Sequence, residues 1–62
     1  MDQLENLINQ LENISESLND VAMSLISDAL HAGETSRPAM EKRVSQARRA
    51  VDKAVMHLKQ DQ

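Results

Sequence analysis

Hydrophobic residues in the first half of the chain recur at alternating steps of three and four. They are Leu4, Leu7, Leu11, Ile14, Leu18, Val21 and Leu25. This spacing is typical of a helix that packs along a seam with other helices, and it predicts a helix over residues 2–31. Asp2 is suited to cap the first turn, with Glu5 three residues later, and Gly33 to end the helix in a left-handed conformation.

The second half shows the same alternation of steps. Its apolar positions are Met40, Val44, Ala47, Val51, Ala54 and Leu58, which predict a helix over residues 37–60. Residues 32–36 form the turn, with Pro38 in the first turn of the second helix. Because a short link holds two helices antiparallel, we expect an all-α fold, a two-helix hairpin that occupies residues 1–62 as one domain. Dimerisation of such a hairpin gives a four-helix bundle.

The two apolar stripes match in antiparallel register, from Leu30 opposite Met40 to Leu11 opposite Leu58. Ala47 and Ala54 place small residues opposite Val21 and Ile14, so we expect a close approach there. Several apolar residues are not used by this seam, among them Leu4, Leu7 and Ile8, where the first helix extends beyond the second. Exposed apolar patches of this kind usually mark a protein interface. We predict that the partner-binding residues are Leu4, Leu7, Ile8, Met23, Ile26, Leu30, Val55 and Met56.

Composition excludes several classes of protein. The chain has 62 residues, no cysteine, no aromatic residue and a single glycine, which leaves no disulfide scaffold and no glycine-rich phosphate loop. Its apolar runs are too short for a membrane span and its start does not resemble a signal peptide, so we expect a soluble protein without membrane association. His31 and His57 lie near opposite ends of the expected hairpin. We therefore predict no catalytic, cofactor-binding or metal-binding residues, and no enzymatic activity.

Charge divides the chain into two unlike halves. Residues 1–31 carry six acidic residues and no Lys or Arg, whereas residues 37–62 carry seven basic and three acidic residues. Helices of opposite charge attract each other and disfavour pairing of like with like. The basic strip of the second helix, Lys42, Arg43, Arg48, Arg49 and Lys53, is the one cue for nucleic acid. A net charge of −3 and the lack of aromatic residues argue against that use, which leaves a Rop-like RNA-binding dimer as a lesser alternative.

Three stretches resemble the YscE-type co-chaperones of type III secretion systems. They are residues 28–34 (DALHAGE), 42–47 (KRVSQA) and 55–58 (VMHL), together with the opening MDQLE. The size and the order of long helix, glycine-containing turn and shorter helix are similar as well. The chain departs from the family in lacking aromatic residues in the second helix and in carrying Pro38.

The resemblance implies a cytoplasmic protein that pairs with a helical-repeat chaperone, and the pair holds the secretion needle subunit before export. The alternative to this non-catalytic interaction module is a homodimeric four-helix bundle with a structural or adaptor role.

Overall fold

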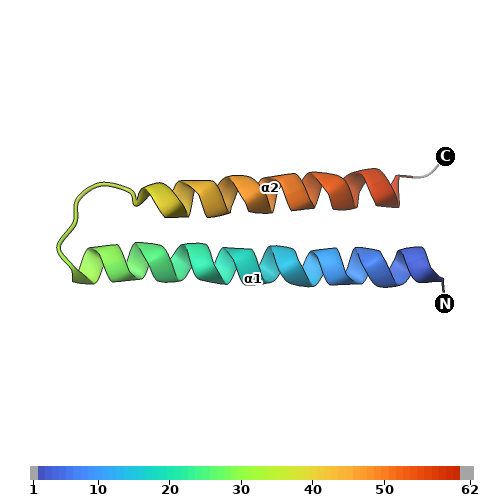
Figure 1. The fold of residues 1–62 in the computed structure, drawn as a ribbon, viewed down its shortest axis with the longest axis horizontal. Helices are drawn as coiled ribbons and strands as arrows, with labels where there is room; N and C mark the ends of the chain where they lie inside the picture. Colours follow the sequence, from blue (N-terminus) through green and yellow to red (C-terminus); the bar gives the residue numbers. More distant parts are fainter. Residues whose placement is uncertain (1, 61–62) are drawn as a thin grey trace.

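The protein is a hairpin of two long helices. A computed structural model describes residues 2–60, in which α1 (Gln3–His31) and α2 (Ala39–Lys59) run antiparallel and side by side (Figure 1). The Cα positions extend over 48 × 19 × 12 Å, so the molecule is a slab one helix thick. The all-α hairpin predicted from the apolar spacing is confirmed.

Both ends of α1 form as the sequence predicts. At the start, the backbone N–H of Glu5 donates to Oδ1 of Asp2 at 3.1 Å, which satisfies one of the free donors of the first turn. At the end, the N–H of Glu34 donates to the carbonyl oxygen of Ala29 and the N–H of Gly33 to that of Leu30, both at 3.0 Å. This is the Schellman pattern, and Gly33 adopts the left-handed φ of +81° that it requires.

The second helix begins two residues later than predicted, at Ala39 in place of position 37. Arg37 precedes a proline, and the proline ring disfavours the helical conformation of the residue before it. Pro38 therefore stands at the N-cap, with φ −60° and ψ 139°, and offers no side-chain cap. The connection is longer than the predicted 32–36, and the chain turns back fully before α2 starts.

The seam between the helices follows a different side of each helix from the predicted one. In α1 the buried and half-buried residues are Ile8, Leu11, Glu12, Ser15, Leu18, Ala22, Leu25 and Ala29. In α2 they are Glu41, Val44, Ser45, Arg48, Val51, Asp52, Ala54 and Val55. Ile14 and Val21, which were expected to face Ala54 and Ala47, are each 47% exposed.

Side-chain size explains this rotation. Two helices meet along a single line, so each of them buries only a narrow strip. Ser15, Ala22 and Ala29 are small and alternate along α1 with the leucines of the predicted stripe. They let α2 approach α1 closely, and the bulkier Ile14 and Val21 are turned to the side. The sequence predicted that Ala47 and Ala54 of the second helix line the seam; Ala54 is half-buried there, whereas Ala47 is exposed.

Replacing Gly33 tests the turn. An added Cβ would meet no atom within 4 Å, so only the positive φ penalises a side chain at this position. We expect Gly33→Ala to lower the free energy of unfolding by about 1 kcal/mol, the cost of a left-handed alanine. Gly33→Asn should cost less, because asparagine tolerates this conformation. Urea denaturation followed by circular dichroism, at one fixed protein concentration, measures both, and equal stability of the alanine variant and the unmodified chain would contradict the assignment.

Candidate functional site

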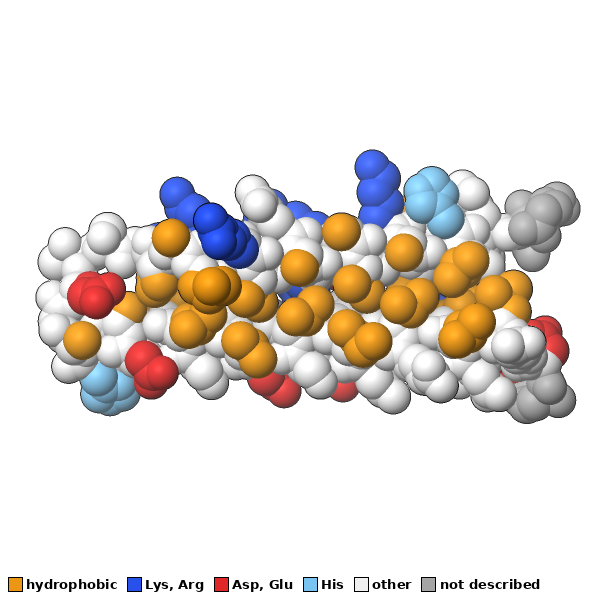
Figure 2. Space-filling model, in the orientation of Figure 1, with side chains coloured by type: hydrophobic (Ala, Val, Ile, Leu, Met, Phe, Trp, Pro, Cys, Tyr) orange, Lys and Arg blue, Asp and Glu red, His pale blue; other side chains and the backbone are white. Residues whose placement is uncertain are grey.

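One broad side of the hairpin is an apolar face. Its exposed members come from both helices and are Leu4, Leu7, Ile14, Val21, Met40, Ala47 and Leu58. Hydrophobic side chains run almost unbroken from one end of the molecule to the other along the groove between α1 and α2 (Figure 2). Basic side chains border this row on the α2 edge and acidic ones on the α1 edge (Figure 2). The two helices with this face form one layer, which is the arrangement of one half of a four-helix bundle.

The other side of the seam is polar. Successive residues of a helix are about 100° apart, so Ser15 of α1 points away from the side on which Ile14 lies. The Ser15 hydroxyl donates to Oδ1 of Asp52 at 2.5 Å, and Nη1 of Arg48 donates to Oδ2 of the same carboxylate at 3.2 Å. This Arg48–Asp52 pair is half-buried, and its carboxylate links α2 to α1 through Ser15.

A second ion pair joins the helices near the chain ends. Nζ of Lys59 lies 2.6 Å from Oε2 of Glu12. Both groups are well exposed, so the pair contributes little to stability. It does join acidic α1 to basic α2, as the charge division of the sequence predicts.

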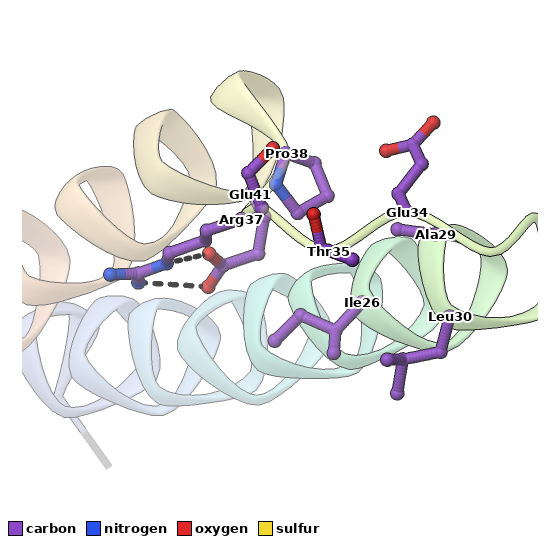
Figure 3. A pocket seen from close by; sticks show the side chains of 9 residues that line it. Ile26, Ala29, Leu30, Glu34, Thr35, Arg37, Pro38 and Glu41 are labelled. Atoms are coloured by element: carbon purple, nitrogen blue, oxygen red, sulfur yellow. Dashed lines mark hydrogen bonds and ion pairs between the residues drawn. The ribbon is translucent and has the colours of Figure 1, made fainter.

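A hollow of about 260 Å³ opens at the loop end of the hairpin. Ile26, Ala29 and Leu30 of α1 line one part of it, and residues 34–38 of the loop together with Glu41 line the rest (Figure 3). Leu30 is 68% exposed, although it is one of the larger apolar side chains of the molecule. The hollow therefore combines an open apolar wall with an ion pair at its rim.

Glu41 is the most deeply buried charged residue of residues 2–60, at 3% exposure. Its carboxylate is bonded to the guanidinium of Arg37, with Nη2 at 3.0 Å from Oε2, and it accepts a hydrogen bond of 2.6 Å from the Ser45 hydroxyl. The bonds from Arg37 and then from Ser45 lower the pKa of Glu41 to about 2, against the opposing effect of burial. The pair also fastens the residue before Pro38 to the first turn of α2, where no side-chain cap is present.

The structure divides the eight predicted partner-binding residues among several places. Leu4 and Leu7 belong to the apolar face, whereas Ile26 and Leu30 line the hollow. Met23 and Met56 are exposed outside both sets, at 62% and 69%.

Ile8 and Val55 are the exceptions and require a correction. They are buried within the hairpin seam, with 9% and 8% exposure, and are not available to a partner. Ile8 was assigned to an overhang of the first helix, but the seam extends far enough to cover it.

Sequence reasoning placed four large residues of the apolar face inside the hairpin. Ile14, Val21, Met40 and Leu58 were assigned to the seam, and the structure exposes all four. One signal was available in the sequence. Polar residues Glu41, Ser45, Arg48 and Asp52 recur at steps of four, three and four beside the apolar stripe of the second helix. That second periodic strip indicates a neighbour on the polar side too.

Other kinds of site find no support in the described residues. Within residues 2–60, no three His, Cys, Asp or Glu side chains come together as a metal-binding group. None of the helices formed by these residues combines the length and the apolarity required to span a membrane. The basic strip is interrupted, because the guanidinium of Arg48 is engaged with Asp52.

No family model matches this chain, and no curated protein or solved structure matches it either. The two surfaces of the hairpin are therefore the basis for assigning a function.

The lowered pKa of Glu41 predicts a pH dependence of stability. A carboxyl whose folded pKa is about 2, against an ordinary value of 4.5, stabilises the fold above pH 4.5. This contribution is lost as the pH falls from there to about 2. We expect the unfolding free energy of the unmodified chain to exceed that of Glu41→Gln at pH 7, and the difference to shrink toward pH 2.

Urea denaturation of both chains at pH 7, 4 and 2.5 measures this difference. Glu16→Gln, at an exposed position of α1, is the matched control for loss of one acidic group. A difference between the unmodified chain and Glu41→Gln that is constant over the whole range would contradict the assignment.

Proposed function

We propose that this chain is a non-catalytic protein-interaction module that stabilises another helical protein by burying apolar side chains against it. The observation that carries the proposal is the amount of apolar surface left open. Among residues 2–60, ten large hydrophobic side chains are exposed, against three buried apolar residues. Apolar surface of this extent is uncommon on a protein that acts alone.

The more specific form of the proposal follows the family resemblance. The chain acts in the cytoplasm as a co-chaperone of the YscE type and binds a helical-repeat chaperone that holds a secretion needle subunit. The hairpin suits this role, because Ile26 and Leu30 at its loop end stay open to the helices of a repeat protein. Binding of the folded form also stabilises an otherwise marginal hairpin by mass action.

The loop-end hollow is the contact we assign to this partner. Ile26 and Leu30 stand open on one wall, and the Arg37–Glu41 pair supplies charge at the rim. An apolar side chain from a partner helix fits such a hollow, and the flanking guanidinium, 48% exposed, remains able to meet a partner carboxylate. Apolar centres with polar borders are the usual arrangement of protein interfaces.

Charge placed on the hollow tests the proposal. Ile26→Glu combined with Leu30→Glu should abolish binding, because two carboxylates would be buried without partners. The control is Asn13→Glu with Ser17→Glu, which adds the same two charges at the same i,i+4 spacing on an exposed side of α1.

The measurement is co-purification of each variant with the helical-repeat chaperone and needle subunit of a type III secretion system from the same organism. We expect the unmodified chain and the control variant to co-purify and the hollow variant to be lost. Equal recovery of both variants would show that the hollow is not the contact. If the unmodified chain itself is not recovered, the co-chaperone function is wrong.

A further inference from the structure

We propose that a second copy of this chain covers the apolar face, and that the two hairpins pack with both loops at the same end. This inference does not require the proposed function, because the apolar face and the loop-end hollow are lined by different residues. The proposal is argued from the area of the face, from its periodicity and from the charges along its borders.

The area is sufficient for a stable dimer. The broad side of the slab measures 48 by 19 Å between Cα positions, or about 900 Å². A standard stable interface buries about 800 Å² on each partner. One copy laid on the whole face therefore covers a footprint of the size that a specific complex has.

The periodicity favours a partner with the same repeat. The exposed residues Leu7, Ile14 and Val21 recur every seven residues along α1, and Met40 and Ala47 do so along α2. In a four-helix bundle, positions of this kind point at the common axis of all four helices. The hairpin seam then buries one border of each apolar stripe, and the second copy buries its centre and its other border. A copy of the chain brings stripes of matching length and step.

Charge decides between the two symmetric arrangements. A twofold axis parallel to the helices places α1 beside α2 of the other copy and brings both loops to the same end. An axis perpendicular to the helices places α1 beside α1 and α2 beside α2, with loops at opposite ends. Residues 1–31 carry six acidic residues and no Lys or Arg, whereas residues 37–62 carry a majority of basic residues. The same-end arrangement therefore alternates the sign of charge around the bundle, and the opposite-end arrangement pairs like with like.

Two residues at the border of the face make this choice specific. Asp28 lies three positions beyond Leu25 and seven beyond Val21, so it continues the α1 stripe toward the loop. Arg43 lies three positions after Met40, on the matching border of α2. Both are exposed in the single hairpin. In the same-end dimer, Asp28 of each copy comes beside Arg43 of the other, which gives two symmetric ion pairs.

Sedimentation equilibrium of the purified chain tests whether the face is covered. Detection by interference optics is needed, because the chain has no Trp or Tyr. We expect a dimer, and we expect Ile14→Glu with Val21→Glu to weaken it by more than about a hundredfold, since four charges would be buried in one core. The control is Ile26→Glu with Leu30→Glu, at the hollow, which should remain a dimer. The proposal is wrong if the unmodified chain stays monomeric at high concentration or assembles beyond a dimer.

Spin labels test the arrangement directly, and the absence of native cysteine allows single labels. A label on Thr35→Cys, in the loop, should lie within about 20 Å of its counterpart in the same-end dimer, because packed helix layers are only about 10 Å apart. In the opposite-end dimer the separation exceeds about 40 Å, the length of a helix of this size. Asn13→Cys, near the middle of α1, reports pairing in both arrangements. A long Thr35 distance in a confirmed dimer overturns the same-end packing.

Exchanging the border charges gives an independent result. Arg43→Asp should raise the dissociation constant of the dimer by about three- to tenfold at low salt, because each pair becomes a repulsion. Adding Asp28→Arg to that variant should restore the affinity. Failure of the second change to restore it overturns the predicted contact between these residues. The variant with Ile14→Glu and Val21→Glu changes the apolar face and leaves the hollow intact. If it loses the dimer but still binds the chaperone, the dimer contact and the chaperone contact are distinct surfaces.

Discussion

Two helices touch along one line, and this constraint determines the rest of the molecule. A strip on each side of that line can be buried, and the remaining surface of both helices stays open. Within residues 2–60, Ile8, Ala22 and Val55 are the buried apolar residues, and no large side chain is fully enclosed. The apolar stripes of this sequence are wider than one line of contact can cover. The hairpin therefore has to place part of them outside, whichever way its helices are rotated.

The rotation that the structure adopts separates polar contacts from apolar ones. On one side of the seam, the hydrogen bond of Ser15 to Asp52 joins the two helices, and Arg48 of α2 holds the same carboxylate. Six of the larger apolar residues lie on the other side, and they are Leu4, Leu7, Ile14, Val21, Met40 and Leu58. A polar contact has a fixed geometry, whereas hydrophobic burial has no preferred direction. The hydrogen bonds thus set the rotation of the two helices, and the apolar face stays available for packing with other helices.

The sequence predicted the features that depend on local chemistry. The caps at Asp2 and Gly33 follow from the hydrogen-bonding and backbone properties of single residues, and both were confirmed. The start of α2 was placed too early, although the restriction that Pro38 imposes on Arg37 is also local. The rotation of each helix was not predictable from the apolar spacing alone, because Ile14 and Ser15 flank the same leucines. The choice between them depends on how closely α2 can approach, and that depends on side chains of both helices together. The ion pair of Glu41 with Arg37 likewise depends on the path of the loop, which spacing does not specify.

The thinness of the slab has a consequence for amide hydrogen exchange. With the Cα positions confined to 12 Å in the shortest direction, each backbone hydrogen bond lies within one side chain of water. Slow exchange in globular domains arises from segments that open only with the whole fold, and a single layer has no interior segment of that kind. Strong protection at particular amides of α1 or α2 would therefore record the surface of another molecule. In the single hairpin, protection is expected to be nearly uniform along both helices. Added protection at individual amides then identifies the residues that a bound molecule covers.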